Sequence, residues 1–285
     1  MLDRESARFD DSFLQERIQP FLGGKPIFLP FSSRWSEERF RHIIDLFDLL
    51  LTSPEDLLSL WLRESFGGLD LGLVQRRPGL GVDASGQPEK EYKDYFHYNP
   101  LLRDMFSERM AGRFPQEELR YIIPLLNVLQ SLYVECREAS WALYRTLKSM
   151  GVPLTSVHGN MSPDIGILRV LRYYPVGQEY LAEPHTDASC WTFCLYEDAP
   201  GLECCIHGIW TPVGYVPGKM MVMPADKVQL ATGGALTTGE LRDDNTRKVI
   251  SGGSIQAVSH RVVNDRSQQR NRVARHSVIF FPHHW

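Results

Sequence analysis

The chain has 285 residues, of which 31 are basic and 35 acidic, so its formal net charge at pH 7 is −4. No long run of like charge occurs, and the sequence therefore predicts neither a nucleic acid nor an anionic membrane surface as a partner. Hydrophobic residues make up 43% and charged residues 23% of the chain, which is ordinary for a globular protein.

The beginning of the chain and its cysteines favour a cytoplasmic location. The first eight residues lack the apolar core of a secretory signal. No apolar run approaches the roughly 18 residues needed to span a bilayer. Five cysteines, an odd number, favour reduced thiols over a disulfide framework. None of these features predicts the oligomeric state.

The region 1–163 is expected to be mostly helical. Ser36, followed by two glutamates, has the pattern of an N-cap at the start of a helix. A long helix with an apolar stripe is expected from about residue 114 to residue 150, interrupted by a kink at Pro124 because proline removes a backbone hydrogen bond. Residues 67–93 are rich in glycine, proline and charge and are expected to form loops with short extended pieces.

From residue 164 onward, apolar and polar residues alternate with period two between regularly spaced turn residues. The runs expected as strands are residues 165–174, 190–197, 203–206, 209–216, 219–224, 226–231, 254–263 and 272–281. Helices followed by strands, without βαβ alternation, favour the α+β class. About eight antiparallel strands suit a jelly roll, which folds them into two facing sheets. We expect one domain over residues 1–285, with the jelly-roll core in residues 164–285.

Three residues of this core are candidate metal ligands. His185 and Asp187 are two apart, so in an extended backbone both side chains leave the same face. His260, which lies in the alternating run of residues 255–263, is the best candidate for a third ligand. His207 and His276 are weaker candidates, because one lies in a hairpin turn and the other alternates away from its neighbours. Two histidines and one carboxylate on one side of a metal suit non-heme Fe(II) with open positions.

Two further residues of the last strand form a candidate site for a carboxylate. Arg275 and Ser277 are two apart and point to the same side of an extended strand. The apolar run at residues 278–281 predicts that this strand is buried, and a buried arginine needs an anionic partner. A guanidinium beside a hydroxyl is well shaped to hold a carboxylate.

In their order and spacing, these motifs resemble those of the Fe(II)/2-oxoglutarate-dependent dioxygenases. The resemblance is to the branch that contains isopenicillin N synthase and the plant flavonoid and gibberellin oxygenases, and it covers about residues 168–282. It implies a double-stranded β-helix core, cupin-like, with N-terminal helices packed on the sheet. It also implies an enzyme that uses O2 and hydroxylates, desaturates or cyclises a small organic molecule while 2-oxoglutarate is decarboxylated to succinate.

The resemblance assigns a role to each candidate residue. His185, Asp187 and His260 would hold Fe(II), and the keto acid end of 2-oxoglutarate would chelate the metal. The distal carboxylate of 2-oxoglutarate would be held by Arg275 and Ser277 with help from a tyrosine. That tyrosine is expected to be Tyr173, with Tyr174 as the alternative. Where the family usually has an asparagine two residues before this tyrosine, the chain has Leu171.

The spacing from Asp187 to His260 is longer than is usual in the family, and the excess falls in residues 233–253. Either this loop or the segment 85–105 is expected to cover the mouth of the pocket. The aromatic candidates for the substrate pocket are Phe96, Tyr98, Trp191, Phe281 and Trp285.

Two other functions are left open by the sequence. An oxidase of the same fold, like isopenicillin N synthase, would take its electrons from the substrate and use no 2-oxoglutarate. A jelly-roll binding protein without catalytic activity is the other alternative. Succinate formation coupled to substrate turnover separates the first of these from the main prediction.

Overall fold

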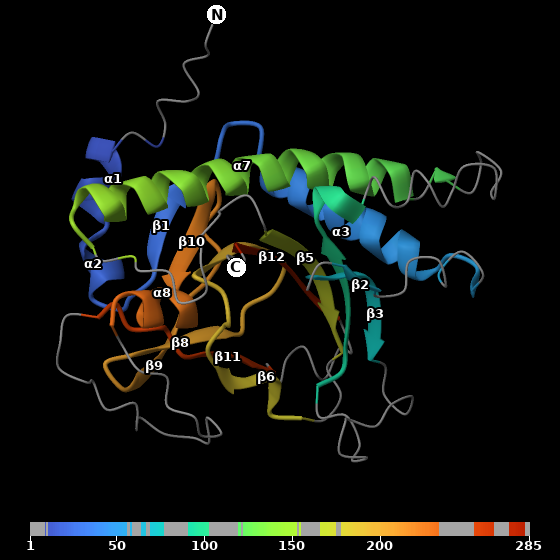
Figure 1. Cartoon of the computed structure of the whole chain (residues 1–285). Coiled ribbons are helices and arrows are strands. Elements are labelled where there is room, and N and C mark those ends of the chain that lie inside the picture. Colours follow the sequence, from blue (N-terminus) through green and yellow to red (C-terminus); the bar gives the residue numbers. More distant parts are fainter. Residues whose placement is uncertain are drawn as a thin grey trace, which may run out of the picture.

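The computed structural model describes residues 9, 11–55, 58, 64–66, 69–76, 91–102, 119–120, 122–152, 154, 166–174, 178–233, 254–264 and 274–282. Two antiparallel sheets form the body of this structure (Figure 1). The larger has eight strands in the order β1-β10-β7-β12-β5-β4-β3-β2, and the smaller has four in the order β6-β11-β8-β9. Two such sheets with helices on one side are the predicted α+β double-stranded β-helix, and the predicted fold class is confirmed.

The strands of the larger sheet are β1 (Ile27–Pro30), β2 (Glu64–Phe66), β3 (Leu69–Arg76), β4 (Lys93–Tyr98), β5 (Gly166–Tyr173), β7 (Trp191–Glu197), β10 (Lys219–Pro224) and β12 (Arg275–Pro282). The strands of the smaller sheet are β6 (Tyr180–His185), β8 (Leu202–Ile206), β9 (Ile209–Pro212) and β11 (His260–Val263). The helices are α1 (Asp11–Arg17), α2 (Gln19–Leu22), α3 (Glu37–Leu51), α7 (Ile122–Ser149) and α8 (Asp226–Ala231). No helix in the described part of the chain is long and apolar enough to cross a membrane.

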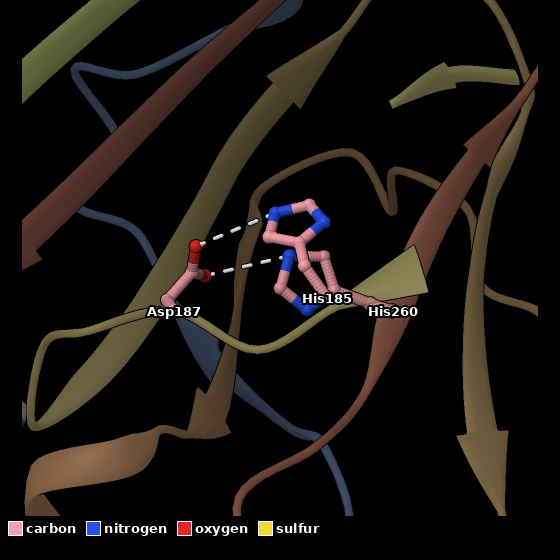
Figure 2. Close-up of side chains that lie close together, drawn as sticks. All are labelled: His185, Asp187 and His260. Carbon is pink, nitrogen blue, oxygen red and sulfur yellow. Dashed lines mark ion pairs between the residues drawn. The ribbon is translucent and has the colours of Figure 1, made fainter. Parts of the chain in front are cut away.

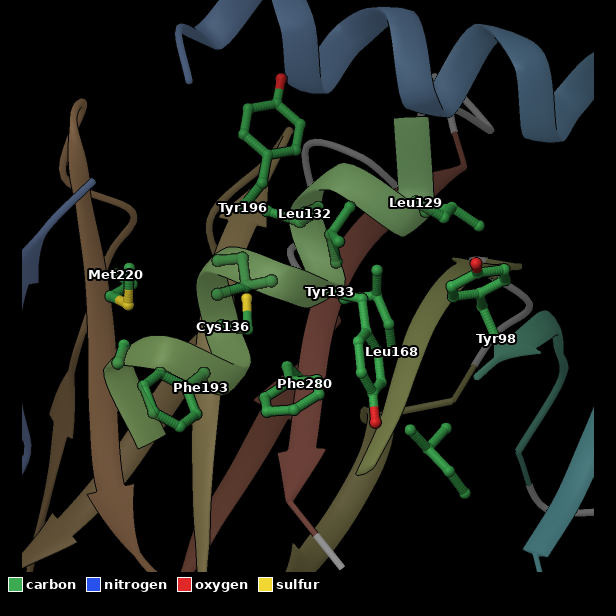
Figure 3. Packing of buried hydrophobic residues seen from close by; sticks show 14 of the residues in the cluster. Tyr98, Leu129, Leu132, Tyr133, Cys136, Leu168, Phe193, Tyr196, Met220 and Phe280 are labelled. Carbon is green, nitrogen blue, oxygen red and sulfur yellow. The ribbon is translucent and has the colours of Figure 1, made fainter. Parts of the chain in front are cut away.

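The long helix α7 covers the outer face of the larger sheet (Figure 1). In the core beneath it, the rings of Tyr133 and Phe280 meet edge to face, with centroids 5.4 Å apart and an interplanar angle of 90° (Figure 3). The hydroxyl of Tyr133 accepts a hydrogen bond of 3.0 Å from the backbone N–H of Gly166 at the start of β5. Because strand side chains alternate, burying Phe280 under α7 turns Arg275 and Ser277 toward the opposite face of the sheet.

The predicted helix start at Ser36 is confirmed. The Ser36 side chain accepts a hydrogen bond of 3.3 Å from the backbone N–H of Arg39, and α3 follows with its apolar side buried. Pro124 lies in the first turn of α7 as described. The first N–H groups of a helix have no partner within it, so proline costs no hydrogen bond there and no kink is needed.

Several elements differ from the secondary structure predicted from the sequence. Residues 226–231 form α8 rather than a strand, because an apolar run this short fits both periods. Within 254–263 only His260–Val263 is a strand. Residues 69–76, in the region expected to form loops with short extended pieces, form β3. Residues 93–98, in the part of the chain expected to be mostly helical, form β4, and both strands extend the larger sheet beyond β5. Strand β6 was not predicted at all.

A buried histidine joins α3 to the larger sheet. His276 on β12 contacts Asp198 through Nδ1 at 2.6 Å and Asp48 of α3 through Nε2 at 3.2 Å. Asp48 also pairs with Arg172 of β5 at 3.2 Å. Burial alone would lower the pKa of His276, but the hydrogen bonds and charges of the two aspartates outweigh it and raise that pKa above its usual value. His276 is therefore a structural cation rather than a metal ligand.

We expect this contact to make stability depend on pH. A pKa raised by folding contributes stability that is complete below the unfolded value near 6.5, and this stability is lost as the pH rises through the folded pKa. The pKa of Asp48 is lowered by His276 and Arg172 against the effect of burial, so the stability that Asp48 contributes is lost as the pH falls through its folded pKa. Urea unfolding at pH 6 and pH 8.5 should show the loss in the native chain. His276→Asn should cost on the order of 1–2 kcal/mol at pH 6 and much less at pH 8.5; an equal cost at both values would contradict the expectation.

Candidate active site

The structure brings the three predicted metal ligands together between the sheets (Figure 2). His185 ends β6 and His260 begins β11, and the antiparallel pairing of these strands sets the two histidines side by side. Asp187 follows β6 and reaches both rings. Its carboxylate oxygens lie 3.7 Å from His185 Nε2 and 3.4 Å from His260 Nε2, and the three ligand atoms lie within 4.8 Å of one another.

Hydrogen bonds orient all three side chains. His185 Nδ1 lies 2.7 Å from the carbonyl oxygen of Glu183, and His260 Nδ1 lies 3.2 Å from that of Val258. A carbonyl oxygen can only accept, so Nδ1 carries the proton in each ring and Nε2 keeps its lone pair toward Asp187. Thr192 donates a hydrogen bond of 2.5 Å to Asp187 Oδ2. Such partners outside the ligand set are typical of metal-binding histidines and carboxylates.

The charge states of the triad fit a divalent cation. Burial opposes ionisation of Asp187, but the two imidazoles, Thr192 and Arg169 outweigh it and hold the pKa of Asp187 below its usual value. Burial lowers the pKa of His260 below its usual value, and the carboxylate of Asp187 opposes this effect. One carboxylate and two imidazoles are the donor set that suits non-heme Fe(II) and leaves other positions open. The residues present therefore fit this metal.

The triad opens into a cavity of about 450 Å³ between the two sheets, and the three residues predicted to bind a carboxylate also line it. Tyr173 pairs with Arg275 across β5 and β12, and the guanidinium carbon of Arg275 lies 5.6 Å from the centre of its ring. Ser277 accepts a hydrogen bond of 2.7 Å from Arg275 Nη1. Tyr174 is not among the residues that line the cavity, because its hydroxyl donates a 2.5 Å hydrogen bond to Asp94 instead. Leu171 is buried in an apolar cluster and offers no polar atom.

Comparisons with known proteins agree with this geometry. Residues 167–284 match the family model described as the 2OG-Fe(II) oxygenase superfamily. The segment that carries the triad is therefore similar to that superfamily. "Gibberellin 20 oxidase 2" of Oryza sativa subsp. indica is 28% identical over 198 residues, which are 66% of this chain and 44% of that protein. "Leucoanthocyanidin dioxygenase" of Malus domestica is 30% identical over 165 residues, 54% of this chain and 43% of that protein. The matched segments thus span less than half of these relatives.

The solved structures extend the similarity of the fold to nearly the whole chain. A 2-oxoglutarate complex of AtDAO1, "dioxygenase for auxin oxidation 1" from Arabidopsis thaliana, superimposes with a TM-score of 0.60 at 15% identity. It covers 97% of this chain and 90% of that one. Fe(II) and 2-oxoglutarate are typical of the superfamily, and the His185, Asp187 and His260 arrangement is in place for the metal.

The cavity also contains a carboxylate that was not predicted from the sequence. Glu197 of β7 lines the cavity and forms a short, buried ion pair with Arg275 Nη2. Simple alternation from Cys194 would point Glu197 away. The pairing of β7 with β12 shifts by one residue, so that Cys194 lies opposite Ile279 and Glu197 lies opposite Ser277. Because of this bulge the side chain of Glu197 lies on the cavity face of the sheet. No pattern in the sequence predicts the bulge.

Other charged residues of the cavity wall were also not predicted from the sequence. Lys93 of β4 forms a short ion pair with Glu91, whose carboxylate accepts a 3.1 Å hydrogen bond from the backbone N–H of Glu183. Arg169 of β5 also lines the cavity. It lies four residues before Tyr173, so alternation along β5 could have placed it on the same face. These residues come from the part of segment 85–105 that the structure describes, and from β5; residues 234–253 lie outside the described residues.

The predicted aromatic lining of the substrate pocket was mostly wrong. Phe281 does line the cavity. Phe96, Tyr98 and Trp191 are instead fully buried in the core beneath α7, where Trp191 Nε1 donates a 3.0 Å hydrogen bond to Ser140 of that helix. Both faces of the larger sheet are buried, one under α7 and the other against the cavity. An apolar side chain is compatible with either face, so the sequence alone does not predict which one it occupies. Trp285 lies outside the described residues.

Proposed function

We propose that this chain is an Fe(II)- and 2-oxoglutarate-dependent oxygenase that oxidises a small organic molecule. The observation that carries the proposal is the convergence of the triad and Arg275 on one cavity. His185, Asp187 and His260 would hold Fe(II) through Nε2, a carboxylate oxygen and Nε2. Bound Fe(II) would supply the activation of O2 that protein side chains cannot perform. Thr192 and the backbone carbonyls would keep the ligands in position as the metal binds.

Arg275 would bind the distal carboxylate of 2-oxoglutarate. A guanidinium has five N–H donors. Arg275 uses three of them, on the carbonyl oxygen of Ala199, on Ser277 and on Glu197, so two remain. Tyr173 lies beside it, and burial raises the pKa of its hydroxyl, which therefore stays protonated as a donor. This arrangement would fix one end of the co-substrate and direct its keto acid end toward the triad.

The cavity is of a size for small molecules, since ligand pockets commonly measure 300–1,000 Å³. The superfamily acts on small-molecule substrates, and we propose hydroxylation as the reaction, with desaturation or ring closure as other outcomes of the same chemistry. We further propose a cytoplasmic enzyme with no nucleic-acid or membrane partner, on the grounds of charge and composition given above. The oligomeric state is left open.

Glu197 favours a second candidate function. A buried guanidinium that already has a carboxylate partner is satisfied without any acidic co-substrate. This is the arrangement expected of an oxidase of the same fold that takes all its electrons from the substrate. The burial of Glu197 raises the pKa of its carboxyl, Arg275 opposing the effect, so protonation of Glu197 could relieve the repulsion between it and an entering carboxylate.

Consumption of 2-oxoglutarate decides between the two functions. We expect the purified chain with Fe(II), O2 and 2-oxoglutarate to form succinate, slowly without a substrate and faster when a substrate is added. Isothermal titration under anaerobic conditions should also show binding of 2-oxoglutarate that depends on the metal. Oxidation of a substrate without 2-oxoglutarate and without succinate would instead establish the oxidase. Metal content and ligand binding unaffected by His185→Ala would indicate a binding protein.

A further inference from the structure

Arg169 is a second guanidinium in the cavity, distinct from the one proposed for 2-oxoglutarate. It lies on β5 opposite Ile279 of β12, whereas Arg275 lies opposite Tyr173. Four residues along β5 separate these two positions, about 13 Å of extended backbone. Both arginines line the cavity, as do Tyr173 and Ile279 from the same faces of the two strands. The cavity therefore has two cationic positions, well separated along its wall.

Contacts with its neighbours fix the orientation of Arg169. Its Nε donates a 2.7 Å hydrogen bond to Nε2 of His97 on the neighbouring strand β4. Its guanidinium carbon lies 5.1 Å from the ring centre of Tyr95 and 4.7 Å from that of Phe281. Guanidinium groups stack favourably on aromatic rings, and a group held in this way loses little freedom when it binds a ligand. The hydrogen bond engages Nε, and the two ring contacts use none of the hydrogens on Nη1 and Nη2.

The charge of Arg169 has no counterpart in the described part of the chain. Lys93 pairs with Glu91 and Arg275 pairs with Glu197, both within the same cavity. Arg172 of the same strand pairs with Asp48. Among the described residues, no carboxylate lies within ion-pair distance of Arg169. A partly buried guanidinium without an anion carries an uncompensated desolvation cost, which an anionic ligand would offset.

We propose that Arg169 binds a carboxylate of the primary substrate, which would make the substrate a small organic acid. The proposal rests on the proposed function, because it takes Arg275 as the site of the co-substrate. A single fork of N–H donors matches a carboxylate, whereas a phosphate dianion would call for a second cation, and Lys93 is already engaged. Phe281 and Ile279 beside Arg169 would pack against the apolar body of the acid. Arg169 and the triad line the same cavity, so an acid held here would lie in the cavity into which the triad opens.

Binding of matched acids and amides to the protein tests this inference directly. The probes are phenylacetate and 1-naphthoate, each paired with its neutral amide, and they are titrated into the protein with Fe(II) and 2-oxoglutarate under anaerobic conditions. We expect each acid to bind the native chain at least about 10-fold more tightly than its amide, the usual effect of a charge-assisted hydrogen-bonded pair. Arg169→Met should remove this preference by weakening acid binding alone, and Arg169→Lys should keep part of it. Arg41→Met, an exposed residue of α3, makes the same change in net charge and should keep the preference.

Several results would overturn the proposal. Equal affinity of acid and amide for the native chain, or no binding of either acid at millimolar concentration, would each contradict it. So would a preference that survives in Arg169→Met or disappears in Arg41→Met. Failure of the proposed function is seen separately, in the titration with 2-oxoglutarate alone. If 2-oxoglutarate does not bind while the acid preference depends on Arg169, the substrate site stands and the co-substrate assignment falls.

Discussion

Replacement of Asp187 by alanine is expected to abolish metal binding and turnover together. Asp187 is the only anionic member of the triad, and both imidazoles are oriented toward its carboxylate. Removing even a hydrogen-bonding partner of a metal ligand typically weakens binding 10- to 100-fold. Loss of the ligand itself should therefore weaken binding of Fe(II) by at least about 100-fold, with a fall in succinate formation at least as large. Binding can be followed anaerobically by calorimetry, or with Mn(II) by electron paramagnetic resonance.

The matched control for this experiment is a histidine outside the site. His207 lies exposed in the turn between β8 and β9 with a positive φ of 53°, a conformation that asparagine tolerates. His207→Asn should keep native metal affinity, whereas His260→Ala should behave like Asp187→Ala. Native metal affinity in Asp187→Ala would refute the assignment of the triad and, with it, the iron-dependent chemistry.

The metal triad could be predicted because its geometry follows from local rules. Side chains two positions apart in extended backbone share a face, and this expectation placed Ser277 with Arg275. The same expectation placed Asp187 with His185, although β6 ends at His185. The third ligand, His260, reaches the site through the pairing of β11 with β6, two strands far apart in the sequence. Its place in an alternating run nevertheless identified it as the best candidate. Tyr173 was predicted from the resemblance to the family, and it lines the same cavity.

The remaining features depend on tertiary structure. A one-residue shift between β7 and β12 turned Glu197 toward the cavity, and such a shift leaves no mark in the sequence. The side chains of Trp191 and Phe96 are buried on the face of the sheet that α7 covers. Alternation within a strand does not predict which of its two faces a helix will cover. The single domain over residues 1–285 stays a prediction, supported by the sharing of one sheet between β1, β3, β4 and the later strands.

Replacement of Arg275 by methionine is expected to have two separable effects. The first is on 2-oxoglutarate, whose binding should weaken by at least about 100-fold, because charge-assisted hydrogen bonds contribute about 1.5–3 kcal/mol each. The second is on stability. Arg275 is 2% exposed and Glu197 is 7% exposed, so the variant leaves a buried carboxylate without its cation. Breaking a buried pair from one side typically costs about 3–5 kcal/mol of unfolding free energy.

A double variant separates these effects. Replacing both members of a buried ion pair by apolar residues is often neutral, so Arg275→Met with Glu197→Met should recover most of the lost stability. It should not recover binding of 2-oxoglutarate, because the guanidinium is still missing. Arg261 and Glu203 form a comparable Arg–Glu pair at 2.7 Å that does not line the cavity. Replacing that pair by methionines should leave the affinity for 2-oxoglutarate within about twofold of the native value, because neither residue lines the cavity.

The same double variant distinguishes the two candidate functions. If Arg275 serves the co-substrate, the stable double variant loses succinate formation. If Arg275 and Glu197 only satisfy each other, as an oxidase without 2-oxoglutarate would require, the double variant keeps its turnover of substrate once its stability is restored. Arg275 therefore either binds an incoming carboxylate in addition to Glu197, or its pairing with Glu197 only stabilises the fold. Measuring both the unfolding free energy and the turnover of the double variant distinguishes these two roles.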